Sequence, residues 1–390
     1  MAAEPLILTA DIQAAGRTYT LYKGLDVKAK VSFSIQKDTS IDAVIHVKEE
    51  HYTIRQAVAR LADALYVVER ELTQHTAFAS EGLSAFGIKI VAPGGYFLEH
   101  RFIDDEVTRR LKQLSAQPYT AVQSELAECK LVQKIFAGIP IFAVSDSALH
   151  AHKPDVAWNY DINLSAADDY DIKRFGYDGI AIESVIQMLG KQRLLVPKLL
   201  VCKLGETSSV TAIKDGQSID TTTGYSLFEG VISHNNMGAI SPAAFQALQS
   251  RTDVTTLDGG IHGISGSSSS IMQLQEQEKA GDHRARLALD MYIYSIQKAI
   301  GQMSAVLGGA DLLIFTGDIA AQTPNLRKRI IEPFDYLGFA IDDSKNNSVN
   351  ITTSPQKINQ RTRVKQIYVL QANESYEIAW RTRKAILNLS

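Results

Sequence analysis

The chain has 390 residues, of which 45% are hydrophobic, and its 40 basic and 43 acidic side chains leave a formal net charge of -3. Because these charges are spread along the chain, the composition argues against the basic surface of a protein that binds nucleic acid or a membrane surface. No apolar run approaches the roughly 20 residues that span a bilayer, and residues 1–5 lack the basic start of a signal peptide, so we expect a cytoplasmic protein of two or three domains.

The first part of the chain reads as a sheet followed by alternating helices and strands. The predicted strands cover residues 6–8, 19–22, 31–35, 86–91 and 139–144. The predicted helices cover residues 54–72, 104–111 and 121–136, the second of them capped by Asp104. The last strand runs into Asp146, and a carboxylate at the carboxyl end of a strand lies where open α/β sheets bind ligands.

A polar, turn-rich segment at residues 151–177 is the best candidate for a boundary between two cores. A second α/β pattern follows it. The predicted strands cover residues 199–203, 210–214, 218–220 and 311–315, with a hairpin turn at Asp215-Gly216. Apolar residues at gaps of four and three predict one long helix over residues 289–307.

The segment from residue 311 to residue 324 combines a buried strand, a glycine turn and a helix start. Gly317 permits a positive φ, Thr323 is a candidate N-cap, and Pro324 suits the first position of a helix. Such a turn can bring backbone amides against a phosphate, but a purely structural turn explains the same residues.

Several blocks of the chain follow one another in a familiar order. They are 142–150 (FAVSDSALH), 173–179 (KRFGYDG), 220–230 (DTTTGYSLFEG), 260–266 (GIHGISG), 315–319 (FTGDI) and 330–342 (IIEPFDYLGFAID). The first five resemble the blocks FDTAFH, RRYGFHG, DTSMGFTPLEG, SGLxGxSG and FTGGI of the acetate kinase family of ATP-dependent carboxylate kinases. The last resembles the segment that follows FTGGI in that family.

The resemblance implies an α/β protein with two domains of the actin/hexokinase-like (ribonuclease H-like) fold and a cleft between them. The domains would be residues 1–150, completed by a C-terminal helix over residues 376–390, and residues 151–375. The resemblance also implies a homodimer that binds ATP and Mg²⁺ and transfers a phosphoryl group to a short-chain carboxylate. Positive charges and hydrogen-bond donors around the transferred group supply most of the catalysis in such a reaction.

The implied catalytic positions are where this chain departs from the family. Lys89 stands at the arginine of GHRVVHGG, and it keeps the charge without the planar fork of a guanidinium. Asn236 stands at the arginine of GTRSGD and removes the charge. The histidine of PLHNP falls near Thr120, and that of RRYGFHG falls on Asp178, where a carboxylate would repel phosphoryl oxygens. Asp146 matches the aspartate of FDTAFH.

The implied nucleotide loops are altered as well. The family's HLGNG becomes KLGET at residues 203–207. The implied nucleotide-binding residues are Gly205, Glu206, Thr207, Ser270, Met272, Gly317, Asp318, Ala320 and Gln322. The implied metal ligands are Glu374, from the TNEE block, and Asp11, which could hold Mg²⁺ through water. Structural interpretations stay open, namely a helix cap for Glu374, a strand-end cap for Asp146 and a solvated strand-end lysine for Lys89.

Three functional hypotheses are compatible with these substitutions. The first is an ATP:carboxylate phosphotransferase whose activity is weak or redirected, because loss of one stabilising arginine costs roughly 10³ to 10⁵ in rate. The second is a non-catalytic pseudoenzyme that binds or regulates, such as a partner of an intact paralogue. The third is a kinase for a cationic acceptor, suggested by the added carboxylates of Asp178 and Glu206.

Overall fold

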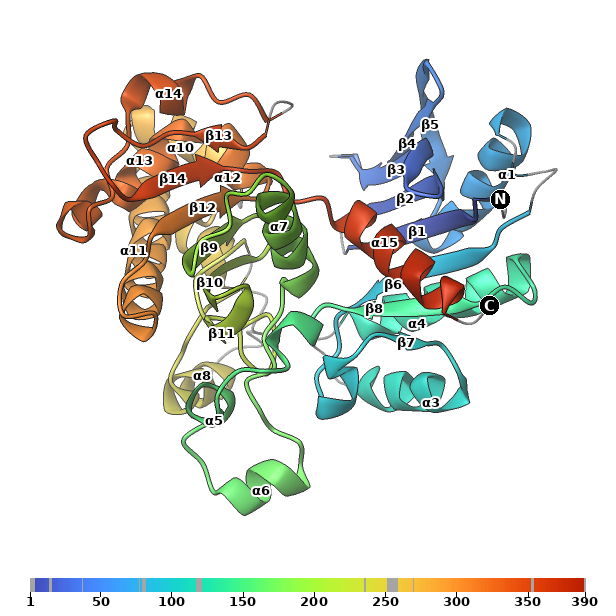
Figure 1. Ribbon diagram of the computed structural model, residues 1–390, viewed down its shortest axis with the longest axis horizontal. Helices are drawn as coiled ribbons and strands as arrows, with labels where there is room; N and C mark the ends of the chain where they lie inside the picture. Colours follow the sequence, from blue (N-terminus) through green and yellow to red (C-terminus); the bar gives the residue numbers. More distant parts are fainter. Residues whose placement is uncertain are drawn as a thin grey trace. The chain divides into compact units, whose positions relative to one another are not determined.

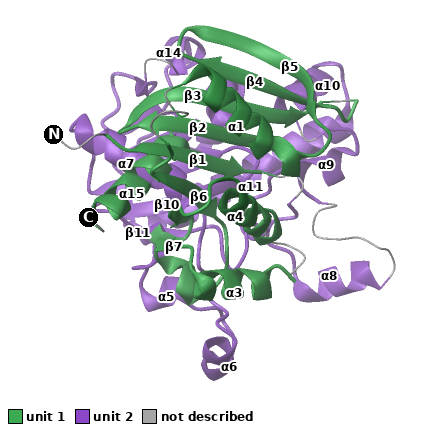
Figure 2. Cartoon of the chain, turned by 90° about the vertical axis from the view of Figure 1, so that its right-hand side faces the viewer, with its two compact units in different colours: residues 1–148, 373–390 green, residues 149–372 purple. Residues whose placement is uncertain are grey.

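The computed structural model of the chain (Figure 1) describes residues 4–13, 16–36, 38–76, 78, 82–116, 121–234, 236–250, 259–268, 270–351 and 354–388. Its contacts divide the chain into two compact units, which Figure 2 shows in different colours. Unit 1 comprises Met1–Ala148 and Asn373–Ser390, and unit 2 comprises Leu149–Ala372. Each unit is built around one mixed sheet.

The sheet of unit 1 has eight strands in the order β5-β4-β3-β2-β1-β6-β8-β7. The strands are β1 (Leu6–Ile12), β2 (Gly16–Lys23), β3 (Asp26–Ile35), β4 (Ile41–Val47), β5 (Glu50–Val58), β6 (Ala85–Ile90), β7 (Arg101–Phe102) and β8 (Ile141–Ser145). The first five form an antiparallel meander, whereas β6 pairs in parallel with both β1 and β8. The five strands predicted for this part of the sequence are confirmed.

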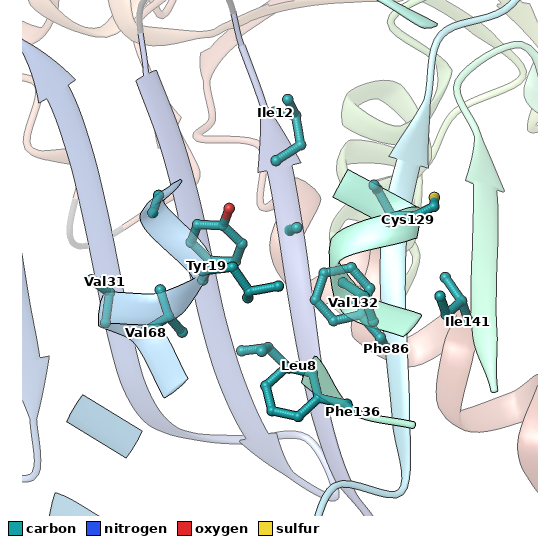
Figure 3. Packing of buried hydrophobic residues seen from close by; sticks show 14 of the residues in the cluster. Leu8, Ile12, Tyr19, Val31, Val68, Phe86, Cys129, Val132, Phe136 and Ile141 are labelled. Carbon is teal, nitrogen blue, oxygen red and sulfur yellow. The ribbon is translucent and has the colours of Figure 1, made fainter. Parts of the chain in front are cut away.

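Helices cover both faces of this sheet. They are η1 (Leu61–Asp63), α1 (Ala64–His75), η2 (Gly95–Leu98), α3 (Asp105–Leu114), α4 (Val122–Ile135) and α15 (Glu374–Leu387), whereas η3 (Ala148–His150) begins at the last residue of this first stretch of unit 1 and continues into unit 2. On one face Val132 of α4 and the adjoining Phe136 pack with Leu8 and Phe86, as Figure 3 shows. The other face carries α15 over Gly87, where a Cβ atom would lie only 2.8 Å from the side chain of Ile378. This close approach explains the glycine and shows that the middle of α15 packs directly on β6.

The helix predicted over residues 54–72 is wrong in its first part. Residues up to Val58 belong to β5, and the α-helix begins at Ala64. Ile54 pairs with Ala43 of β4, so strand pairing, which the local spacing of apolar residues does not reveal, takes the backbone bonds of this segment. The other two helices are confirmed, and Asp104 caps α3 by accepting a 2.8 Å hydrogen bond from the amide of Val107.

The sheet of unit 2 has six strands in the order β11-β10-β9-β12-β14-β13. They are β9 (Lys198–Leu204), β10 (Ser208–Lys214), β11 (Gln217–Thr221), β12 (Leu312–Thr316), β13 (Gln356–Lys357) and β14 (Gln366–Val369). The central strands β9, β12 and β14 are parallel. Asp215 and Gly216 have φ angles of 51° and 82°, as a two-residue hairpin turn requires, so the predicted hairpin between β10 and β11 is confirmed.

Two long helices cover the faces of this second sheet. Leu200 and Cys202 of β9 pack on the side of α11, whereas Leu199 and Val201 pack on the side of α7. The helices of unit 2 are α5 (Asp155–Trp158), α6 (Leu164–Asp169), α7 (Gly179–Lys191), α8 (Pro242–Gln249), α9 (Gly260–Ser265), α10 (Ile271–Lys279), α11 (His283–Val306), α12 (Asp318–Gln322), α13 (Pro324–Ile331), η5 (Glu332–Leu337) and α14 (Asp343–Asn347). The long helix predicted over residues 289–307 is confirmed as α11. Within the described ranges, no helix combines the length and the apolar character needed to cross a bilayer.

Candidate functional site

The fold of unit 1 gathers charged residues at the carboxyl ends of its parallel strands. Lys89 is the penultimate residue of β6, Asp146 follows β8 directly, and Asp11 lies near the end of β1. Glu374 is the first residue of α15, the helix that packs over these strands. Parallel pairing of β6 with β1 and β8 therefore brings together residues that lie far apart in the sequence.

Lys89 is ion-paired inside this group. Its Nζ atom lies 2.7 Å from Oε2 of Glu374 and 3.8 Å from Oδ1 of Asp146. The side chain of Lys89 is 15% exposed and that of Asp146 is 1% exposed. Burial opposes the charge of Lys89, but the carboxylates of Asp146, Glu374 and Asp11 outweigh it and hold the pKa of Lys89 well above its usual range. Lys89 is thus not a solvated strand-end lysine.

The helix-cap interpretation of Glu374 is also wrong. Asn373 occupies the N-cap position of α15, and its side-chain oxygen accepts a 3.0 Å hydrogen bond from the amide of Tyr376. The carboxylate of Glu374 instead accepts the hydrogen bond of Lys89. The charge of Glu374 therefore serves the group at the strand ends.

A partly buried histidine, His100, supports the strand end that carries Asp146. The backbone amide of Ser145 donates a 3.1 Å hydrogen bond to Nδ1 of His100, so the imidazole is neutral in this arrangement. Burial lowers the pKa of His100 to about 4, and the charge of Arg381 adds to this effect. The hydroxyl of Ser145 donates to the carbonyl of Phe97. These contacts hold the backbone that leads into Asp146.

Glu125 of α4 is a buried carboxyl that the sequence analysis missed. Its Oε1 atom accepts a 3.0 Å hydrogen bond from the amide of Val91, whereas its Oε2 atom is buried without a hydrogen-bond partner. Burial raises the pKa of Glu125 to about 8, and the charges of Asp146 and Asp11 act in the same direction. The sequence feature that could have indicated this burial is the position of Glu125 on the amphipathic helix α4, where it stands three residues after Val122 at a place expected to be apolar.

Unit 2 contains a second charged network, centred on Asp178. This residue precedes α7 in a left-handed conformation, and its side chain is 2% exposed. Its carboxylate accepts hydrogen bonds from Nζ of Lys203 at 2.8 Å, from the hydroxyl of Thr207 at 3.1 Å and from the hydroxyl of Ser209 at 2.7 Å. The sequence analysis predicts that the carboxylate of Asp178 repels phosphoryl oxygens, and in the structure the ammonium of Lys203 offsets this negative charge.

Asn236, at the position of the second implied arginine, is hydrogen-bonded to the backbone of its own loop. Its side-chain nitrogen donates a 2.7 Å hydrogen bond to the carbonyl of Leu227, and its side-chain oxygen accepts a 2.9 Å bond from the amide of Gly238. Asn236 is only 6% exposed. Thr120, the remaining catalytic prediction, lies outside the described residues.

The predicted phosphate loops lie at the ends of two neighbouring parallel strands of unit 2. Gly205 follows β9 and Gly317 follows β12, and the last residue of β12 pairs with Lys203. Gly317 has a φ of 92°, and a Cβ atom there would lie 2.3 Å from the carbonyl oxygen of Leu204, so strand packing alone requires a glycine. A Cβ atom at Gly205 would meet nothing closer than 3.5 Å, so packing does not require a glycine there.

The helix after Gly317 differs from the expected one. A five-residue helix, α12, comes first, and Thr323 then occupies the N-cap position of α13 with Pro324 at its start. The hydroxyl of Thr323 donates to the carbonyl of Ile319 at 2.5 Å, so it does not cap α13.

The other predicted nucleotide residues lie in three different settings. Asp318, Gln322, Glu206 and Met272 are exposed. Ala320 is fully buried in the hydrophobic cluster of unit 2, so its side chain is a packing residue. Ser270 caps α10 through a 3.4 Å hydrogen bond from the amide of Gln273.

The expected Mg²⁺ does not fit the arrangement in unit 1. The carboxylate of Glu374 already accepts a hydrogen bond from the ammonium of Lys89 through its Oε2 atom. Among the residues that the structure describes, no three histidine, cysteine, aspartate or glutamate side chains are grouped so that they could hold a metal ion. A metal bound to Glu374 would lie within a few ångströms of the ammonium of Lys89, which would repel it.

Comparison with known proteins gives a consistent result. The model of the Acetokinase family matches residues 22–380. The acetate kinase of Thermoanaerobacterium thermosaccharolyticum is 28% identical over 389 residues, which cover 95% of this chain and 94% of that protein. The acetate kinase of Methanosarcina acetivorans is 32% identical over 318 residues, which cover 77% of this chain and 76% of that protein.

Solved structures give the fold. The propionate kinase of Francisella tularensis superposes with a TM-score of 0.86 at 22% identity, over 97% of this chain and 99% of that one. The expected α/β fold of the two-domain actin/hexokinase-like class is therefore confirmed.

Proposed function

Since the chain belongs to the Acetokinase family and is thereby a homologue of carboxylate kinases, we propose that it transfers a phosphoryl group from ATP to a short-chain carboxylate of the acetate class, with slow turnover. The observation that carries this proposal is the group of Lys89, Asp146 and Glu374 at the strand ends of unit 1. A buried aspartate held beside a cation there keeps the acidic part of the implied site. The nucleotide would lie at Gly205, Thr207 and Gly317 of unit 2, where two parallel strands end side by side.

Slow turnover is proposed because two implied catalytic positions offer no free positive charge and a lysine beside the nucleotide loop is paired as well. Phosphoryl transfer needs positive charge on the oxygens of the moving group. The ammonium of Lys89 is held by Glu374, and the ammonium of Lys203 is held by Asp178. Asn236 contributes no charge and is bonded to its own loop. Each lost donor of this kind costs roughly 10³ to 10⁵ in rate, although such losses are not additive within one catalytic unit.

The test is an assay of ADP formation with acetate, propionate and butyrate as acceptors. We expect turnover at least about 10³-fold below that of the acetate kinase of Methanosarcina acetivorans measured in parallel. Asp146→Asn should abolish the residual turnover, whereas Asp343→Asn, which changes an exposed ion pair of unit 2, should leave it unaltered. Turnover equal to that of the relative would refute the slow rate, and full activity of Asp146→Asn would refute the assigned site.

A non-catalytic binding or regulatory role is the second candidate. The observation that favours it is the pair of Asp178 and Lys203, which ties down a lysine at the start of a phosphate loop. Calorimetry with ATP and with ADP separates the two candidates. Binding without turnover would favour regulation by nucleotide, and no binding of either nucleotide would favour a scaffold.

The assembly and the location of the protein are further inferences from family membership. We infer a homodimer in the cytoplasm, with a nucleotide and a small carboxylate as its ligands. Light scattering after gel filtration measures the mass directly, and a monomer at micromolar concentration would contradict the dimer.

A further inference from the structure

Unit 1 holds a cation of its own at the place where family membership leads one to expect a metal. The Nζ atom of Lys89 lies 2.7 Å from Oε2 of Glu374 and 3.8 Å from Oδ1 of Asp146. We propose that the ammonium of Lys89 is a tethered counter-ion that neutralises these two carboxylates and excludes a divalent cation from them. The inference takes from the proposed function only the expectation of a metal, and it holds whether or not the protein catalyses phosphoryl transfer.

The positive charge of Lys89 opposes binding of a divalent cation to Glu374. Mg²⁺ binds carboxylate oxygens at about 2.0 to 2.1 Å and requires nearly octahedral coordination. The ammonium of Lys89 already occupies the space in front of Oε2 of Glu374 at hydrogen-bond distance. A metal on that oxygen would bring two like charges within a few ångströms of one another, in a setting where Lys89 is only 15% exposed. Binding of a metal is therefore disfavoured while the ammonium of Lys89 stays in place.

Burial explains why the lysine stays. Asp146 is 1% exposed, and a carboxylate this deeply buried is costly unless a positive group accompanies it. Lys89 lies on β6, which pairs in parallel with β1 on one side and with β8 on the other, so its backbone is fixed. Because the ammonium of Lys89 is covalently attached to the chain, its effective concentration at the carboxylates is high. A metal ion in solution has to compete with this high local concentration.

The same arrangement gives Lys89 a role different from that of the implied arginine. Its positive charge neutralises carboxylates of its own unit. The ion pair with Glu374 also holds the start of α15 against the end of β6. The residue therefore acts on the site by neutralising the carboxylates that would attract a metal. Its side chain is a determinant of which cation the site accepts.

The direct test is binding of Mn²⁺ to the full chain without nucleotide, followed by electron paramagnetic resonance. Wild type and Glu374→Gln should give the same titration, because Glu374 offers no metal site when Lys89 holds it. If wild type binds Mn²⁺ and Glu374→Gln binds it at least about tenfold more weakly, the carboxylate is a metal ligand and the proposal is overturned.

The complementary test removes the tethered charge. Lys89→Met keeps much of the length of the side chain and leaves Asp146 without this cation, so we expect a lower melting temperature. Millimolar Mn²⁺ should raise that temperature again, since a ligand that binds only the folded state stabilises it. The matched control is Lys112→Met, which changes an exposed lysine of α3 in the same unit.

Three outcomes of this second test bear on the proposal. Rescue of Lys89→Met by Mn²⁺, absent from the double variant with Glu374→Gln, supports it. Equal metal responses of Lys89→Met and wild type would overturn it. If Lys89→Met does not fold, the comparison of wild type with Glu374→Gln decides alone. Failure of the kinase assay leaves each of these outcomes unchanged, because no nucleotide is present.

Discussion

The buried pair of Asp178 and Lys203 predicts a large coupling energy in unit 2. The carboxylate of Asp178 accepts hydrogen bonds from Lys203 and from the hydroxyls of Thr207 and Ser209. Asp178→Asn removes the charge without straining the backbone, because asparagine tolerates the φ of 63° at this position. It leaves the ammonium of Lys203, only 13% exposed, without its counter-charge, so we expect a loss of about 3 kcal/mol in the free energy of unfolding.

The reverse substitution and the double variant complete the cycle. Lys203→Met should cost about 2 kcal/mol, since Asp178 keeps two hydroxyl donors after the ammonium is gone. The double variant has neither buried charge, and we expect it to cost only about 3 kcal/mol in total. The two single losses then exceed the loss in the double variant by about 2 kcal/mol, which is the coupling energy of the pair.

Urea unfolding measures these energies in the relevant unit. The chain has two tryptophans, so a Trp380→Phe background leaves Trp158 to report on unit 2 alone. The control is the same cycle at Asp343 and Lys328, which lie 2.8 Å apart but are 59% and 55% exposed, and its coupling should stay below about 1 kcal/mol. A coupling energy for Asp178 and Lys203 no larger than that of the control would refute the reasoning.

Three further predictions follow from single buried groups. Burial raises the pKa of Glu125 from its ordinary 4.5 to about 8, so the folded state keeps a proton that the unfolded state releases, and the stability of unit 1 should fall by about 1.4 kcal/mol per pH unit between those values. Urea titrations across this range should show the slope in wild type and not in Glu125→Gln, and a slope common to both would contradict the assignment. Arg327 is fully buried and donates hydrogen bonds to backbone carbonyls at the end of α12. Arg327→Met should therefore lower the free energy of unfolding by about 3 kcal/mol, whereas Arg361→Met, at an exposed position, should lower it by less than about 0.5 kcal/mol. Equal urea midpoints of the two variants would exclude this role of Arg327. Asn236→Arg should lower the melting temperature without restoring rapid turnover, because it breaks two hydrogen bonds within its loop; a gain in rate approaching 10³-fold would show that the missing charge alone limits the reaction.

Local patterns in the sequence predicted part of the regular structure. The hairpin at Asp215 and Gly216, the cap at Asp104 and the long helix α11 each depend on residues within one short segment, and each is confirmed. The helix expected from residue 54 failed because Ile54 finds its backbone partner in another strand. Thr323 lies at the expected helix start, but the short helix before it offers its hydroxyl a nearer acceptor.

The candidate site was likewise predicted in part from the sequence and decided in part by the tertiary structure. The order of the sequence blocks identified the family and located Lys89, Asp146 and Glu374, because backbone turns and strand ends are specified locally. Which charges neutralise one another was decided only by the tertiary structure, since Coulomb energies depend on separations of a few ångströms between residues that the sheet brings together from distant segments. The tertiary structure thus pairs Lys89 with Glu374 and Lys203 with Asp178. It also buries the carboxyl of Glu125, which no local sequence pattern indicated.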